Sequence, residues 1–196
     1  MRLKPTRITP PGVDLIELVD ARRQCNIDDQ GSDDMLRGII GSVTDYLEAP
    51  AGILRVCLLK QTWRESLSYF PIYAIPLSVD PLIEVQKVEY IAPGATTWSE
   101  VPADQYEVFE AVSGAWVVPL EGFSWPDTAN RVECVRVTYQ AGYASADKVP
   151  RGIVQAAKLL LGHYFENREA TLVGVPAQEL PLGIKSLLQP YFRIPV

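Results

Sequence analysis

The sequence predicts an α+β fold: a helical bundle from N-terminal and C-terminal helices, with a small antiparallel β subdomain inserted between them and an extended C-terminal tail. Three observations predict it. Apolar residues recur at helical spacing near both ends, they alternate with polar residues in the middle, and prolines interrupt the last segment. With 196 residues, of which 47% are hydrophobic and 21% charged, the chain can bury a core without metals or disulfides.

The first part of the chain, residues 1–57, is predicted to be helical. After a proline-rich lead, residues 13–21 form a short helix because three apolar residues recur at helical spacing: Leu15, Leu18 and Val19. A second helix follows Ser32, a residue type that caps helix starts, and it ends at Pro50 and Gly52. Its apolar stripe consists of Met35, Leu36, Ile39, Ile40, Val43 and Leu47.

Residues 58–141 are predicted to form the β-rich insertion, because the apolar period changes from 3.6 to 2. Turn residues such as Pro93-Gly94 and Ser113-Gly114 separate the strands. The five expected strands cover residues 63–69, 83–91, 105–109, 115–118 and 135–139. Five short strands of this kind indicate an antiparallel subdomain with a polar outer face.

Helical spacing returns in residues 142–169, which are predicted to complete the bundle. The helix starts near Pro150, and its apolar face consists of Ile153, Ala157, Leu160, Leu161, Tyr164 and Phe165. Residues 170–196 are predicted to be an extended docking tail, since prolines recur too often for a long helix; only residues 183–189 have room for two turns. An apolar tail docks either on its own core or on a partner.

The sequence shows no pattern typical of an enzyme, a cofactor site or a metal site. The single histidine, His163, lies within an apolar helix and is interpreted as a packing residue. The three cysteines, Cys25, Cys57 and Cys134, lie too far apart for a zinc site and are expected to be reduced and buried. No phosphate-binding loop is present, and the paired aspartates near residues 28–34 fit the start of a helix.

Charge distribution argues against a general nucleic-acid binder. The net charge is −6, and residues 61–148 carry 12 acidic against 5 basic side chains. The four tryptophans, Trp63, Trp98, Trp116 and Trp125, are expected to be core and edge residues of the β segment rather than a stacking platform. No apolar run reaches the ~18 residues of a membrane span, so we expect a soluble protein made in a cytoplasm.

Several segments, taken in order, resemble the head-tail connector (adaptor) proteins of tailed phages and their counterparts in gene transfer agents. They include VTYQAGY at 137–143 and HYFENREA at 163–170. The others are residues 15–29, 33–48, 61–63, 81–83, 124–126, 149–150, 180–183 and 187–191. The chain departs from the family at Cys25, where leucine is common, and in its longer, proline-rich lead before Val13.

The resemblance implies a structural protein of the virion head-tail interface, synthesised in the bacterial host cytoplasm. It implies a homo-oligomeric ring, twelvefold when assembled, that sits on the portal protein, extends the DNA channel and offers a platform to a stopper or tail-side connector. DNA passes without sequence-specific binding. No enzymatic activity, cofactor or membrane partner comes with the family.

We expect the tail to supply the main partner contacts, and we expect arginines near the N-terminus to pair with Asp28, Asp29, Asp33 or Asp34 of a neighbouring protomer or to be solvated. The candidate interface residues are Leu172, Val173, Leu180, Pro181, Leu182, Leu187, Leu188, Tyr191, Arg22, Arg23 and Arg37. Two alternatives remain open: another connector-ring component, such as a stopper or tail terminator, and a small ligand- or carbohydrate-binding module.

Overall fold

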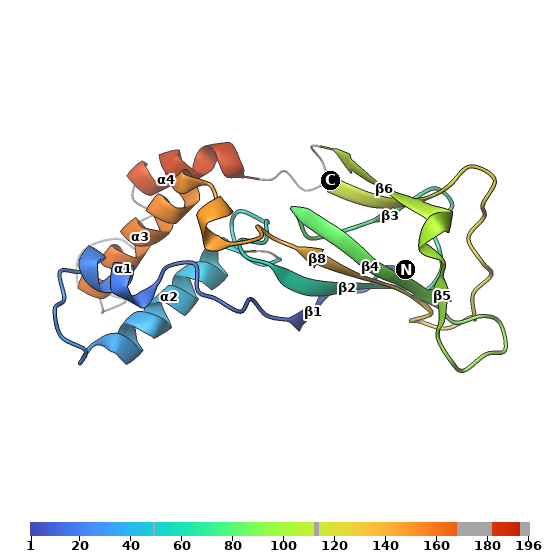
Figure 1. The fold of residues 1–196 in the computed structure, drawn as a ribbon, viewed down its shortest axis with the longest axis horizontal. Helices are drawn as coiled ribbons and strands as arrows, with labels where there is room; N and C mark the ends of the chain where they lie inside the picture. The colour runs from blue at the N-terminus through green and yellow to red at the C-terminus, as the bar shows by residue number, and fades with distance from the viewer. Residues whose placement is uncertain (49, 112–113, 168–181, 193–196) are drawn as a thin grey trace, which may run out of the picture. The chain divides into compact units, whose positions relative to one another are not determined.

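The computed structural model of the protein describes residues 1–48, 50–111, 114–167 and 182–192. These residues form two compact units (Figure 1). The β unit contains residues 1–11 and 60–144, and the helical unit contains residues 12–59 and 145–192. The chain therefore leaves and re-enters the β unit, and both units are built from discontinuous segments.

Two antiparallel sheets make up the β unit. The first has five strands in the order β1-β2-β8-β4-β5, with bounds β1 (Thr6–Thr9), β2 (Gln61–Leu67), β8 (Val135–Ala141), β4 (Leu82–Tyr90) and β5 (Ser99–Val101). The second has three strands in the order β3-β7-β6, with bounds β3 (Ile75–Pro76), β7 (Gly114–Pro119) and β6 (Tyr106–Ala111). A short 3₁₀ turn, Ala103–Gln105, precedes β6.

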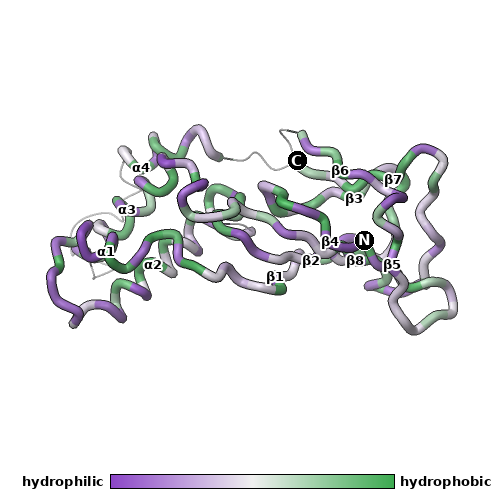
Figure 2. Tube along the Cα trace, in the orientation of Figure 1, coloured by the Kyte–Doolittle hydropathy of each residue, from purple (hydrophilic) through white to green (hydrophobic). Residues whose placement is uncertain are grey.

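The long strands form where apolar and polar residues alternate, as predicted. β2 buries Trp63 and Leu67 and pairs along its whole length with β8, which buries Val137 and Tyr139. The strands predicted from periodicity are confirmed as β2, β4, β6, β7 and β8. Figure 2 colours the chain by hydropathy and shows hydrophobic and hydrophilic residues interspersed in both units.

Glu65, a fully buried carboxylate on β2, joins three segments of the β unit. Its carboxylate accepts hydrogen bonds from the Tyr139 hydroxyl at 3.1 Å, the Ser78 backbone N–H at 2.8 Å and the Arg2 guanidinium at 3.2 Å. Burial and the neighbouring Glu65 charge raise the pKa of Tyr139. Because a buried carboxylate needs compensating donors, Glu65 fixes the N-terminal segment against the sheet.

The helical unit consists of α1 (Leu18–Gln24), α2 (Asp33–Leu47), α3 (Arg151–Glu166) and α4 (Leu182–Leu188), followed by a 3₁₀ turn, Gln189–Tyr191. A further 3₁₀ turn, Ala146–Lys148, precedes α3. α2 and α3 pack through apolar stripes, as predicted, which bury Leu36, Ile40, Val43, Leu47, Ile153, Ala156, Ala157, Leu160 and Leu161. An ion pair at 2.7 Å between Lys158 and Asp20 links α3 to α1.

The predicted fold class, a helical bundle with a small inserted β subdomain, is wrong. Of the described residues, about 30% are helical and 26% are in strands, and they form four helices and eight strands in two antiparallel sheets, so the fold is sheet-rich. The sequence reading missed β1, β3 and β5, which have four, two and three residues. Strands this short contain too few alternations for periodicity to detect.

The N-terminal region differs most from the prediction. The lead before Val13 includes β1, which is exposed along its whole length and pairs with β2. The first helix begins at Leu18, later than predicted, because Glu17 is extended (φ −65°, ψ 145°). Leu15 and Ile16 are buried, but they lie before the helix. Ser32 stands at the N-cap of α2 as predicted, although its side chain makes no capping hydrogen bond.

The predicted two-turn segment of the tail is α4.

Within the described residues, no helix is long and apolar enough to cross a membrane.

Candidate interaction surfaces

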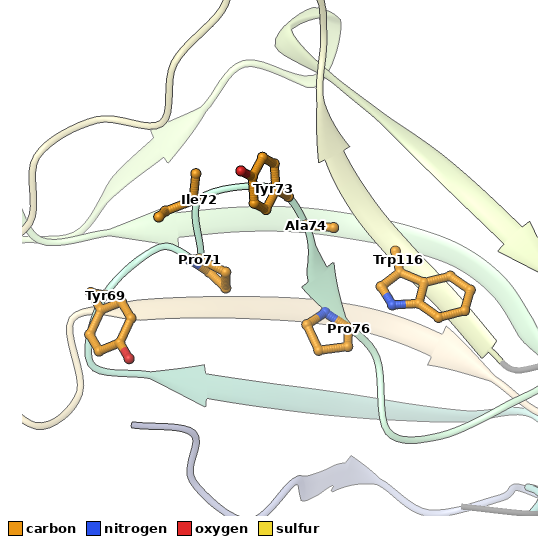
Figure 3. A pocket seen from close by; sticks show the side chains of 7 residues that line it. All are labelled: Tyr69, Pro71, Ile72, Tyr73, Ala74, Pro76 and Trp116. Carbon is orange, nitrogen blue, oxygen red and sulfur yellow. The ribbon is translucent and has the colours of Figure 1, made fainter. Parts of the chain in front are cut away.

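An exposed group of large apolar side chains lies on the β unit in the loop between β2 and β3. We call residues 69–73 the aromatic loop. Ile72 and Tyr73 are 83% and 82% exposed, and Tyr69 is 59% exposed. These side chains line a shallow pocket of about 450 Å³ together with Pro71, Ala74, Pro76 and Trp116 (Figure 3). Contiguous exposed apolar surface of this kind is typical of protein contact sites.

The aromatic loop stands on a rigid base. Phe70, its second residue, stacks on Trp125 with ring centroids 4.7 Å apart and an interplanar angle of 2°. Phe123 and Tyr106 also pack around Trp125, at 5.9 and 6.4 Å. Aromatic stacking of this kind holds the base of the loop while its other side chains face solvent.

Strand β6 forms a second exposed surface. It pairs with β7 on one side, and in the described part of the chain its other edge is free. Every residue after Tyr106 is exposed, including Phe109 at 59% and Val108 at 38%. Phe109 lies opposite Trp116 across the hairpin, with ring centroids 6.1 Å apart. We call this strand, with its side chains Glu107 and Glu110, the acidic edge.

The other tryptophans have structural environments, as predicted. Trp63 is 3% exposed in the core of the five-stranded sheet. Trp98 lies under the Arg136 guanidinium at 4.0 Å. That guanidinium also forms two 2.8 Å hydrogen bonds to Glu89, and these bonds lower the pKa of the Glu89 carboxyl.

His163 and the cysteines do not form a cluster. The His163 ring is half-buried on α3, 6.0 Å from the ring of Tyr164 and 3.3 Å from the Asn167 side-chain nitrogen. All three cysteines are free thiols; Cys57 and Cys134 are buried, and burial raises the pKa of the half-buried Cys25. Among the described residues, no group of His, Cys, Asp and Glu has the arrangement of a metal site.

The three candidate arginines all have partners within their own helical unit. Arg22 forms a two-bond ion pair with Asp33, which joins α1 to the start of α2 and lowers the pKa of Asp33. Arg37 contacts Asp34 at 2.9 Å, and Arg23 contacts Asp20 at 3.6 Å. A role for these arginines between protomers stays a prediction.

The candidate tail residues divide into three groups. Leu172, Val173, Leu180 and Pro181 lie outside the described residues, and Leu182 is the first residue of α4. Leu187 is half-buried, whereas Leu188 is fully buried. The Tyr191 ring packs on α3 so closely that a Cβ atom at Gly152 would lie 2.9 Å from it. The end of the described tail therefore packs within its own helical unit.

Sequence reasoning missed both exposed surfaces of the β unit. The sequence does contain a signal for the aromatic loop. Residues 70–75 are Phe-Pro-Ile-Tyr-Ala-Ile, so five of six are apolar, the sixth is proline, and the strand alternation is broken. The signal for the acidic edge was the pair of glutamates within an apolar strand.

Comparison with known proteins identifies the fold. No protein-family model and no curated protein sequence matches the chain. A chain in the structure of the neck of an empty gene transfer agent particle, computed with C6 symmetry, matches with a TM-score of 0.79 and 17% identity, over 99% of this chain and 97% of that chain. The fold is that of a gene transfer agent neck structure.

Two further structures agree. One is the neck of a native gene transfer agent particle computed with C12 symmetry, with a TM-score of 0.71 and 19% identity. The other is the virion of a native gene transfer agent particle, with a TM-score of 0.71 and 16% identity. Each match covers 99% of this chain and 97% of the other. The fold is therefore shared with chains of gene transfer agent particles, which agrees with the resemblance to gene transfer agent proteins stated from the sequence.

Proposed function

We propose that the protein is a structural head-tail connector of a tailed phage or phage-like particle, located at the head-tail interface of the virion. The observation that carries the proposal is the fold match to gene transfer agent neck structures over nearly the whole of both chains. A match of both units, in their discontinuous order, is much more specific than a match of one common domain. In this role the protein has no catalytic activity.

The protein assembles as a ring of identical copies. The similar neck structures were computed with C6 and C12 symmetry, which supports a cyclic arrangement around the DNA channel. In a cyclic ring each copy contacts the next through two different surfaces, so the chain needs two separate patches. The exposed apolar residues of the β unit supply surface of the required kind.

The portal protein is the proposed head-side partner, and the tail supplies the contact through Leu172, Val173, Leu180 and Pro181. The charge of residues 149–196, with five basic and three acidic side chains, suits an acidic receptor surface. Leu188 is not a free anchor for this contact because its side chain is already buried in the helical unit.

The aromatic loop is the proposed contact for the stopper or tail-side connector. Its Ile72 and Tyr73 side chains are almost fully exposed on a base held by the Phe70–Trp125 stack. The pocket beneath them is lined mainly by apolar groups, which fits an apolar side chain of a partner protein better than a sugar.

The test is the mass of the purified chain, alone and mixed with its portal protein, measured by native mass spectrometry. We expect a ring-sized complex with the portal. A Leu172→Asp/Val173→Asp variant should stay folded and lose the complex. The matched control is Val13→Asp/Val132→Asp, which makes the same change at residues 61% and 62% exposed and should retain it.

If the wild-type chain stays small and ignores the portal, the adaptor role is wrong and a stopper, tail-terminator or ligand-binding role replaces it. If the tail variant binds the portal normally, the ring role stands and the tail is not the contact.

A further inference from the structure

We propose that copies of this chain join through their β units, with the acidic edge of one copy receiving the basic N-terminal strand segment of the next. The inference rests on the proposed ring and names the two surfaces that build it. The occupant of the acidic edge is thus residues 2–9 of a second copy.

The acidic edge has the features of a strand that pairs with another chain. β6 is exposed on both faces and has one free edge in the described residues. A free edge offers a row of backbone N–H and C=O groups, and Val108 and Phe109 add exposed apolar area. The third strand of this sheet, β3, pairs with β7 at only two residues, so most of the β6–β7 hairpin is two-stranded and an added strand would stabilise it.

The second surface lies on the other sheet of the β unit. β1 is the edge strand of the five-stranded sheet, and all four of its residues are exposed. It is held firmly, because Thr6 and Arg7 pair with β2 and the Arg2 guanidinium bonds to Glu65. β1 is therefore an ordered edge that is available to a neighbour.

Charge complementarity selects a second copy as the occupant. Residues 1–11 contain three basic and no acidic side chains, Arg2, Lys4 and Arg7. Residues 99–111 contain four acidic and no basic side chains, Glu100, Asp104, Glu107 and Glu110. Two acidic edges repel each other and two basic strands do likewise, so only the unlike pair is favourable. This pair is head-to-tail, which is the contact that a cyclic ring requires.

Acidic residues on a free edge also have a simpler explanation, since charges protect edge strands from unwanted pairing. The two explanations make opposite predictions for charge reversal. Under simple protection, replacing the glutamates by lysines leaves assembly unchanged. Under the proposed contact, the reversal places like charges opposite each other and blocks assembly.

The experiment uses two full-length variants. Variant A is Glu107→Lys/Glu110→Lys, and variant B is Lys4→Glu/Arg7→Glu. We measure oligomer mass by native mass spectrometry, alone and on the portal, at low and high ionic strength. We expect each variant alone to need about tenfold or more protein for half-assembly.

An equimolar mixture of variants A and B provides the decisive readout. The β6 edge of variant A, now basic, meets the N-terminal segment of variant B, now acidic. The acidic β6 edge of variant B meets the basic N-terminal segment of variant A. Every contact between unlike variants is therefore attractive, and the two variants assemble in alternation. Rings of six or twelve copies close in this way because both numbers are even. Rescue in the mixture also excludes misfolding as the cause of each single defect. The matched control, Glu84→Lys/Asp127→Lys, reverses two other acidic residues of the β unit and should assemble normally.

Three results overturn the inference. If variants A and B each form rings like the wild type, the ring role stands but these surfaces are not the contact. If both fail and the mixture also fails, the residues matter for another reason, such as binding a different protein. If the wild-type chain forms no ring either alone or on the portal, the proposed function fails together with the inference.

Discussion

At the scale of single residues, the β unit pairs two buried carboxylates with arginine side chains. Glu65 and Glu89 are both buried carboxylates of the β unit, and each accepts hydrogen bonds from an arginine. Pairing offsets the free-energy cost of removing a charge from water. When one partner is lost, the other charge stays buried without compensation and the fold is destabilised. The free energy of unfolding should therefore fall when either glutamate is replaced by a residue of the same shape without the charge.

Replacing Glu89 with glutamine should lower the free energy of unfolding by about 2–4 kcal/mol at neutral pH, since the Arg136 charge loses its partner. The effect should depend on pH. Hydrogen bonds from Arg136 and Lys87 lower the pKa of Glu89 below its ordinary value of 4.5. The carboxylate therefore stabilises the fold fully above about pH 4.5, and this contribution is lost as the pH falls through the lowered pKa. Urea titrations from pH 3 to 7 should show the two proteins converging in acid.

Gly52 should not tolerate a side chain. A Cβ atom at this position would lie 2.2 Å from the Glu48 carbonyl oxygen, which is backbone and cannot move aside. The Gly52 backbone N–H also bonds to that oxygen at 2.6 Å. We expect Gly52→Ala to lower the unfolding free energy by about 2 kcal/mol or more, as measured by thermal unfolding. Gly38→Ala, at an open position on α2, is the control and should be neutral or stabilising.

At the scale of elements, long periodic segments were predictable and short ones were not. α2 and α3 were found because 15 and 16 residues repeat an apolar stripe several times. β1 was missed because its four residues are all exposed and are held by pairing with β2, a contact that local sequence does not encode. The acidic edge was missed for the same reason. Whether β6 has a free edge depends on which strands pair with it, and local sequence does not encode that pairing.

The interface residues expected in the tail were chosen for being apolar, and this criterion cannot separate residues that pack internally from residues that meet a partner. Leu187 and Leu188 were both selected, yet only Leu188 is fully buried. We expect Leu188→Ala to cost about 2–4 kcal/mol of unfolding free energy and Leu187→Ala about 1 kcal/mol or less. Chemical denaturation of the two variants tests this order, and equal costs would contradict the packing of α4.

At the scale of the whole molecule, the long segment of the β unit carries an acidic excess that its basic N-terminal segment partly offsets. Residues 60–144 contain 11 acidic and 5 basic side chains, within a total net charge of −6. This balance suits the proposed connector role, because a surface that repels DNA does not retain it during passage.

The purified protein should not bind duplex DNA. In an electrophoretic mobility assay, DNA should migrate unshifted even at low ionic strength, where attraction to basic surfaces is strongest. Variant A, in which the acidic edge becomes basic, tests whether β6 contributes to this repulsion. A shift of DNA by the wild-type protein that disappears on adding salt would contradict the prediction.

The pairing of β1 with β2 has a consequence for the order in which the protein is made. Thr6 lies beside Arg64, 58 positions later, and β8, which separates β2 from β4, leaves the ribosome last among these strands. The first strand synthesised must therefore wait, unpaired, until β2 has emerged, which takes about a third of the chain. A fusion partner placed at the N-terminus would extend directly from the segment that pairs at this edge of the sheet, so such a tag should be removed before folding or assembly is measured.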